Sequence, residues 1–272
     1  LAPWHNLLLA TNWRNVSQVD AYAEHLAFGE HLQQTLGIEP TVEYSNTLRP
    51  QRKLRIGFVS GDLRTHSVSY FVEACLRNFN AQKFEAWAYY NHTQFDHRSA
   101  ELKHLFAEWR SIVGLNDEDV AALIRRDRID ILVDLSGHTG NSRLDVFAHR
   151  PAPVQVSWIG YPNTTGLKTI AYRITDAIAD PVGESEPFYC ETLVRLPDCF
   201  LCYTAPQVAP AIGPLPMQKD SIVTFGSFNG RVKITDETLA LWSRILASVK
   251  DSRLLVKSVS GLADSIGKRQ LI

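Results

Sequence analysis

Hydrophobic residues cluster over 54–59 and then recur at helical spacing over 67–79. The first cluster is a short apolar run typical of a buried strand. In the second segment, apolar residues three or four positions apart would form one stripe along a helix. The pattern therefore predicts a strand, a polar loop and a helix.

The same alternation continues as far as residue 158. Alternating strands and helices favour a parallel sheet covered by helices on both faces, so we expect an α/β, Rossmann-like fold. Further strands are predicted at 84–90, 110–113, 129–135, 153–158, 170–174 and 193–196, and helices at 97–108, 117–126 and 142–149.

The two ends of the chain follow a different pattern. Near the start, apolar residues from Val19 to Phe28 predict an amphipathic helix, and the polar stretch 43–52 predicts a linker. Proline-rich residues 206–216 are typical of a connection between domains. Beyond them, strands at 222–228 and 253–256 and an intervening helix predict a second strand–helix–strand unit.

About 50 residues follow position 221, whereas a doubly wound domain needs roughly 100. We therefore expect the second domain to be truncated. The predicted organisation is a helical lead-in and linker (1–52), an N-terminal Rossmann-like domain (53–205), a connection (206–221) and the start of a C-terminal domain (222–272).

Composition narrows the class of protein. The 272 residues are 45% hydrophobic, which is ample for a soluble globular core. The 28 Lys and Arg residues are balanced by 29 Asp and Glu residues, so the overall basic charge that nucleic-acid binding needs is missing. The sequence contains neither an apolar run of about 18 residues nor the start of a signal peptide. We expect a cytoplasmic location without membrane or nucleic-acid partners.

Several kinds of site can be set aside. The four cysteines are too few and too unevenly spaced for a disulfide framework, so we expect free thiols. Cys199 and Cys202 have the spacing of zinc ligands, but no second pair accompanies them and no metal site is predicted. Neither the dinucleotide glycine fingerprint nor a P-loop is present, which disfavours dehydrogenases and kinases. We expect no cofactor.

Polar residues collect in the loops that follow the predicted strands, where parallel sheets bind ligands. His66 lies between a predicted strand and a predicted helix. It could act in catalysis or binding, cap the helix, or belong to the core. Asp134 ends an apolar strand, where a carboxylate is costly unless it is paired; a cap or a salt bridge would explain it.

Two further loops are candidates. Residues 160–166 carry hydroxyls, an amide and glycines that could let a bound backbone pass close by, although a tight turn would look similar. Residues 227–234 place Arg231 and Lys233 beside a predicted helix N-terminus, which could bind a phosphate or could simply expose solvated charges.

Five ordered segments resemble the catalytic region of the protein O-glycosyltransferases that include O-GlcNAc transferase and the SPINDLY-type O-fucosyltransferases. The resemblance spans about residues 52–257, and the run Arg150-Pro-Ala-Pro-Val-Gln155 is its most specific part. The segments are 55–60 with 66–71, 129–139, 150–166, 195–203 and 225–229.

This resemblance implies a two-domain GT-B-type fold with facing Rossmann-like halves. The second half would hold most of a nucleotide sugar, and the acceptor peptide would cross the cleft. Helical TPR repeats that bind protein substrates would lie upstream. Residues 1–50 are too short and irregular for such repeats and are similar to the lead-in between repeats and catalytic core.

The resemblance also implies roles for single residues. His66 would act as a base or contact the donor, Asp134 would follow the central strand, and Lys233 would steady the donor's diphosphate as a Ser or Thr hydroxyl attacks the sugar. Gly230 departs from the family, which usually carries Asn or Gln there. The implied donor-binding residues are Asn229, Arg231 and Lys233, and the implied acceptor residues are His138, Tyr161, Pro162, Asn163, Thr164 and Thr165.

The leading hypothesis is therefore a protein O-glycosyltransferase that uses UDP-GlcNAc, with acceptor proteins and a nucleotide sugar as partners. GDP-fucose is the alternative donor. A non-catalytic peptide-binding module is a second alternative, and an epimerase or dehydrogenase lacks its glycine fingerprint. We expect the chain as given to fold without transferring sugar.

Overall fold

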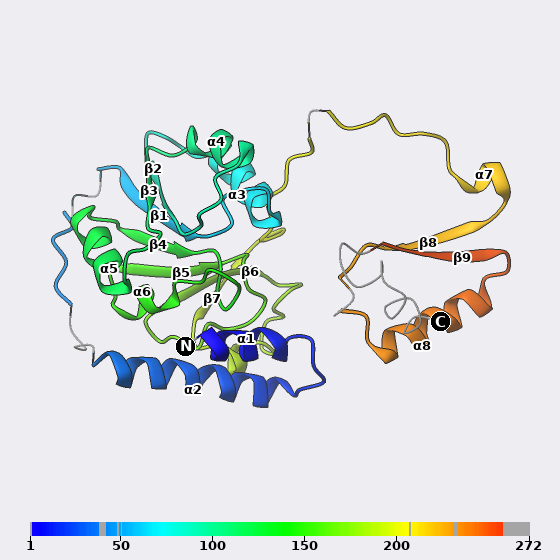
Figure 1. Ribbon diagram of the computed structural model, residues 1–272, viewed down its shortest axis with the longest axis horizontal. Helices are drawn as coiled ribbons and strands as arrows, with labels where there is room; N and C mark the ends of the chain where they lie inside the picture. Colours follow the sequence, from blue (N-terminus) through cyan, green and yellow to red (C-terminus); the bar gives the residue numbers. More distant parts are fainter. Residues whose placement is uncertain are drawn as a thin grey trace. The chain divides into compact units, whose positions relative to one another are not determined.

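Seven parallel strands form one sheet in the order β3-β2-β1-β4-β5-β6-β7 (Figure 1). This confirms the predicted α/β fold with a Rossmann-like sheet. The strand order reverses between β1 and β4, so the loops that follow these two strands emerge side by side. The strands are β1 (Leu54–Ser60), β2 (Phe84–Tyr90), β3 (Glu108–Ser111), β4 (Ile131–Asp134), β5 (Val154–Trp158), β6 (Tyr172–Asp176) and β7 (Thr192–Leu196).

The computed structural model describes residues 2–37, 42–47, 49, 51–206, 208–230 and 233–257. Contacts divide the chain into two compact units, Leu1–Ala205 and Pro206–Ile272. Among the described residues, no helix has the length and apolar character needed to cross a membrane.

Helices cover both faces of the sheet and enclose two apolar cores. Neighbouring residues of a strand face opposite sides, so Phe58 packs in one core and Val59 in the other. Figure 1 shows α3 and α4 on one face and α1, α2, α5 and α6 on the other. These helices are α1 (Ala2–Thr11), α2 (Gln18–Leu36), α3 (Ser67–Arg77), α4 (His97–Lys103), α5 (Asp117–Arg126) and α6 (Leu144–Ala148); a short 3-10 helix, η1, spans Glu186–Phe188.

Some elements differ from their predicted bounds. The helix predicted at 97–108 ends at Lys103. Leu105 and Phe106 continue its apolar pattern in the sequence, but they lie in the turn that follows and pack into the core from there. The strand predicted at 170–174 runs from Tyr172 to Asp176. Helix α1 was not predicted, since its three consecutive leucines do not show helical spacing.

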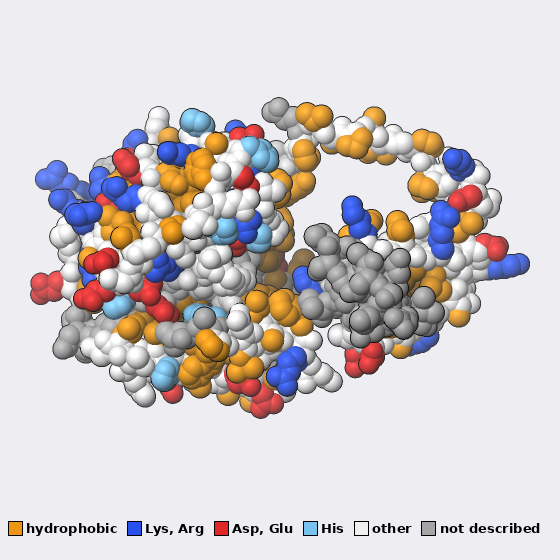
Figure 2. Space-filling view, viewed as in Figure 1, with side chains coloured by type: hydrophobic (Ala, Val, Ile, Leu, Met, Phe, Trp, Pro, Cys, Tyr) orange, Lys and Arg blue, Asp and Glu red, His pale blue; other side chains and the backbone are white. Residues whose placement is uncertain are grey.

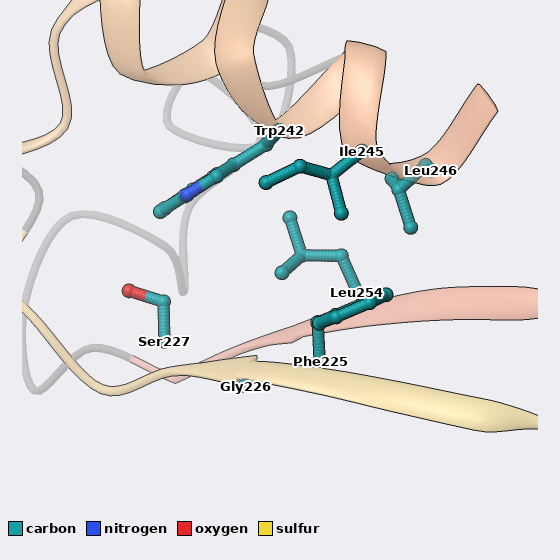
Figure 3. Close-up of a pocket in the computed structure, with 7 residues that line it drawn as sticks. All are labelled: Phe225, Gly226, Ser227, Trp242, Ile245, Leu246 and Leu254. Atoms are coloured by element: carbon teal, nitrogen blue, oxygen red, sulfur yellow. The ribbon is translucent and has the colours of Figure 1, made fainter. Parts of the chain in front are cut away.

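The second unit contains a parallel strand pair with one helix beside it, in the predicted order. In Figure 3, Ile245 and Leu246 of the helix point toward Phe225 and Leu254 of the two strands, and Trp242 lies above Ser227; these side chains line a hollow of about 160 Å³. None of the helix residues is fully buried. The elements are α7 (Met217–Asp220), β8 (Val223–Ser227), α8 (Asp236–Ser248) and β9 (Ser252–Val256).

Helix α2 lies directly against the loop that follows β5. A Cβ atom added to Gly29 would stand 1.9 Å from the carbonyl oxygen of Gly166, and one added to Gly166 would stand 2.0 Å from the carbonyl oxygen of His25. Gly166 also has a left-handed backbone, with φ of +76°. The two backbones can approach this closely only because neither glycine carries a side chain.

We expect Gly29→Ala to lower the free energy of unfolding by about 2 kcal/mol, the typical cost of forcing extra atoms into a packed contact. Urea denaturation followed by circular dichroism measures this change. Gly140→Ala is the matched control, because a Cβ atom there meets nothing within 4 Å. Equal stability of both variants would contradict the close packing of α2 on the loop.

Candidate functional site

The loop that follows β1 is held between its two neighbours at the carboxyl edge of the sheet. A Cβ atom on Gly61 would come within 2.7 Å of the Asn141 side chain, in the loop after β4. On the other side, the amide of Thr65 donates to the carboxylate of Asp96 at 2.9 Å. The side chain of Asn91 ties the two outer loops together by donating to the carbonyl oxygen of Asn141 at 3.0 Å.

His66 ends this loop and caps α3. Its backbone is extended, and its Nδ1 atom accepts a hydrogen bond from the amide of Val68 at 3.3 Å. The capping interpretation considered from the sequence therefore describes part of its role. The side chain is 38% exposed, so the imidazole also reaches solvent at the edge where ligands bind in such sheets.

Asp62 faces the same imidazole and was missed by the sequence analysis. Its Oδ2 atom lies 3.6 Å from Nδ1 of His66, and its Oδ1 atom lies 3.7 Å from the Arg64 guanidinium. Burial raises the pKa of Asp62, while the positive charges of His66 and Arg64 oppose that shift. The spacing of four residues between acid and histidine was the available signal, but a loop does not fix which side chains meet.

The Nδ1 atom of His66 has two competing neighbours. It accepts from Val68 only when unprotonated, which leaves the proton of the neutral ring on Nε2. When Nδ1 carries the proton toward Asp62, the Nε2 lone pair becomes free to accept a proton from a hydroxyl. Asp62 is thus placed to favour the tautomer that a general base requires.

Asp134 stabilises the loop that follows β4. The carboxylate is buried at the end of β4 and accepts hydrogen bonds from the amides of Ser136 and Gly137 at 3.0 and 2.9 Å. Burial raises its pKa to about 6 despite these hydrogen bonds, and the charge of Glu191 adds to the shift. This arrangement matches the cap considered from the sequence, and it shapes the loop after β4, which contacts the loop after β1 at Gly61.

Most of the implied acceptor residues are buried beneath the surface. The Tyr161 hydroxyl donates to the Leu8 carbonyl at 2.9 Å and lies 2.7 Å from Nε2 of His25. Thr164 and Thr165 bind the buried carboxylate of Glu191. These three residues therefore fix the loop to its surroundings.

His138 is also buried. Its Nε2 atom lies 2.9 Å from the carbonyl oxygen of Thr165, which can only accept, so Nε2 carries the proton. Its Nδ1 atom then accepts from His5 at 2.8 Å. Burial lowers the pKa of His138 well below its ordinary value, and the neighbouring His25 and His5 add to the shift. A neutral His138 packed among the helices holds the loop in place.

Pro162 and Asn163 are the implied acceptor residues that reach the surface. They line a hollow of about 720 Å³ in the first unit, between the α1–α2 turn and the loop after β6. The buried guanidinium of Arg173 supports this wall by donating to the carbonyl oxygens of Tyr161 and Asn163 at 3.0 Å each.

The implied donor residues belong to the second unit. Lys233 and Asn229 are exposed after β8, and the Lys233 amide donates to the Gly230 carbonyl at 3.0 Å. Arg231 lies outside the described residues. The following helix, α8, is capped by its own Thr235. Within the described part of the chain, no group of His, Cys, Asp or Glu could hold a metal ion.

We expect replacing Asp134 by Asn to change how stability depends on pH. The folded-state pKa of about 6 lies above the ordinary pKa of an aspartate, about 3.9, so burying the carboxylate costs stability as pH rises through this window. Between pH 4.5 and 7.5, Asp134→Asn should gain about 2 kcal/mol in unfolding free energy relative to the wild type. Urea titrations at both pH values test this, and a constant difference would refute it.

We expect Asp62→Asn to raise the share of His66 that carries its proton on Nε2. The substitution keeps the side-chain size and removes the charge that attracts a proton to Nδ1. Nitrogen-detected NMR of the imidazole distinguishes the two tautomers. Arg64→Gln is the control, because it leaves the Asp62 carboxylate in place. An unchanged tautomer ratio in Asp62→Asn would show that Asp62 does not orient the ring.

Comparisons with known proteins agree with this architecture. The model of glycosyl transferase family 41 matches residues 2–212. The chain is 43% identical over 272 residues to the probable UDP-N-acetylglucosamine–peptide N-acetylglucosaminyltransferase SPINDLY of Arabidopsis thaliana, covering 98% of this chain and 29% of that protein. It is 30% identical over 205 residues to the UDP-N-acetylglucosamine–peptide N-acetylglucosaminyltransferase of Caenorhabditis elegans, covering 73% and 17%.

Among solved structures, an O-GlcNAc transferase mutant of Thermobaculum terrenum matches with a TM-score of 0.90 and 34% identity, over 99% of this chain and 51% of that one. The match confirms the predicted GT-B-type glycosyltransferase fold, and the chain spans less than a third of the length of SPINDLY. The predicted resemblance is confirmed as well: the chain belongs to glycosyl transferase family 41.

Proposed function

We propose that this chain forms the N-terminal part of the catalytic region of a protein O-glycosyltransferase. Such an enzyme transfers a sugar from a nucleotide donor to a Ser or Thr hydroxyl. The observation that carries the proposal is the partly exposed His66 imidazole, 3.6 Å from the Asp62 carboxylate, at the point where the strand order reverses. Family membership and the names of the relatives support the same reaction class.

In this reaction, Nε2 of His66 accepts the proton of the acceptor hydroxyl. The hydroxyl oxygen forms a bond to the anomeric carbon of the sugar, and the bond from that carbon to the diphosphate oxygen breaks. Negative charge then develops on the departing nucleoside diphosphate. Lys233 is the cation assigned to stabilise it, and its exposed position after β8 leaves its ammonium accessible.

The hollow beside Pro162 and Asn163 is the proposed path of the acceptor polypeptide on the first unit. Its lining combines the exposed Gln18 amide with the rings of Phe188 and Tyr189. Amides can pair with an extended backbone, and aromatic faces can cover apolar side chains of the acceptor. The buried residues behind the hollow hold its wall in position.

UDP-GlcNAc is the proposed donor, in keeping with the names of the relatives. GDP-fucose is the alternative, because the sequence resembles the SPINDLY type most closely around 66–71 and 195–203. A non-catalytic peptide-binding module is the remaining alternative.

The test uses a form of the chain extended to the length of its relatives, with a peptide acceptor and each donor in turn. His66→Asn keeps a helix-capping side chain but removes the base, so it should lower turnover while α3 remains capped. Lys233→Ala should cost roughly 2–4 kcal/mol of transition-state stabilisation. The control is Lys219→Ala, which removes another exposed lysine of the second unit and should leave transfer unchanged.

Wild-type transfer rates in both His66→Asn and Lys233→Ala would contradict the assigned roles. Absence of transfer from either donor by the extended wild type would favour the peptide-binding module. A clear preference for GDP-fucose would overturn the proposed donor while leaving the reaction class in place.

A further inference from the structure

A basic hollow lies at the amino edge of the sheet, opposite the edge that carries His66. Its volume is about 320 Å³, and it lies beside the first residues of β1 and β2 and the turn that precedes β4. Figure 2 shows Lys and Arg side chains gathered at this end of the first unit, on the left of the view. The lining residues are Asn46, Thr47, Arg52, Lys53, Arg55, Glu85 and Arg128.

Two of the four cations in this hollow are paired with acids. Arg52 makes a bidentate contact with the buried carboxylate of Asp130, at 2.6 and 2.5 Å. Arg55 donates to Glu85 at 3.2 Å. Lys53 and Arg128 have no acidic partner among the described residues. The hollow therefore carries about two uncompensated positive charges, in a chain whose net charge is −1.

Arg55 is fixed in place before any ligand arrives. Its Nη1 atom donates to the Asp127 carbonyl at 2.8 Å, and its guanidinium lies 5.1 Å from the centre of the Trp87 ring. In the described part of the chain, no hydrogen bond uses its Nη2 atom. An ordered cation with a spare donor loses little conformational freedom when it binds an anion.

The wall that carries Arg128 is ordered as well. The Asn46 side chain donates to the carbonyl oxygens of Arg128 and Ile129 at 3.2 Å each, and to Asp130 at 2.6 Å. These bonds hold the linker segment 42–47 against the turn before β4. The Arg52 Nε atom donates to the Thr47 carbonyl at 2.6 Å and closes the other side.

We propose that this hollow binds a phosphate monoester dianion. Two uncompensated cations match the charge of the dianion, and Arg55 and Arg128 can donate to its oxygens with the planar geometry that suits phosphate. The exposed Lys53 adds a positive charge at the rim of the hollow. The site is separate from the proposed transfer reaction, because it lies at the other edge of the sheet.

The phosphate can belong to a small molecule or to a phosphorylated Ser or Thr side chain of a peptide. The test titrates the chain with inorganic phosphate, glucose 6-phosphate and a phosphoserine peptide with its unphosphorylated counterpart, using calorimetry at low salt. We expect the phosphorylated probes to bind and the unphosphorylated peptide not to bind. Tighter binding of the phosphopeptide than of glucose 6-phosphate would identify a peptide as the source, and the reverse order a small molecule.

The double substitution Lys53→Gln with Arg128→Gln should weaken phosphate binding at least tenfold. Lys103→Gln with Lys219→Gln is the matched control, since it removes the same charge from exposed positions elsewhere. Both double variants should unfold at the same urea concentration as the wild type. Equal phosphate binding by the two double variants, or no binding of any phosphorylated probe to the wild type, would overturn the proposal.

Discussion

The contact between the backbones of α2 and the loop after β5 is the constraint on which the first unit depends. Gly29 and Gly166 allow this contact because a side chain at either position would overlap a carbonyl oxygen of the other segment. The approach brings His25 within hydrogen-bonding distance of Tyr161, and α1 supplies a carbonyl acceptor to the same hydroxyl. The lead-in helices α1 and α2 therefore support the wall of the hollow beside Pro162 and Asn163. Their buried apolar residues belong to the core that also contains Val59.

Buried polar groups fix the loops at the carboxyl edge of the sheet by hydrogen bonds. Glu191 accepts hydrogen bonds from the hydroxyls of Thr164 and Thr165. Arg173 donates to two carbonyl groups of the same loop, and Asp134 accepts from amides of the loop after β4. Each group would be costly to bury alone, and each finds its partners in a neighbouring loop or in its own. At the same edge the His66 side chain stays partly exposed.

The sequence predicted the sheet because strand and helix periodicities are local and strong in residues 54–200. It also placed His66 and Asp134 after strands of one parallel sheet, since parallel strands end at one edge; that the two strands are neighbours emerged from the structure. It did not predict α1, and it did not separate surface residues from buried ones in the loop at 160–166. Those outcomes depend on contacts between distant segments, such as Tyr161 with Leu8 and His138 with His5, which no local pattern encodes. Asp62 was missed for a different reason: it is only four residues from His66, but an irregular loop does not fix which of its side chains meet.

The hydrogen bonds of Tyr161 also constrain substitutions at distant positions. Its single hydroxyl connects to Leu8, Asn12 and His25, so it joins both lead-in helices to the loop after β5. A change of His25 or Asn12 alone would remove a partner from a buried hydroxyl, and a change of Tyr161 alone would leave Nε2 of His25 without its partner. A physical constraint on the loop therefore extends to residues more than a hundred positions away in the sequence. Substitutions in the lead-in helices and in the loop after β5 are thus energetically coupled through one buried hydroxyl.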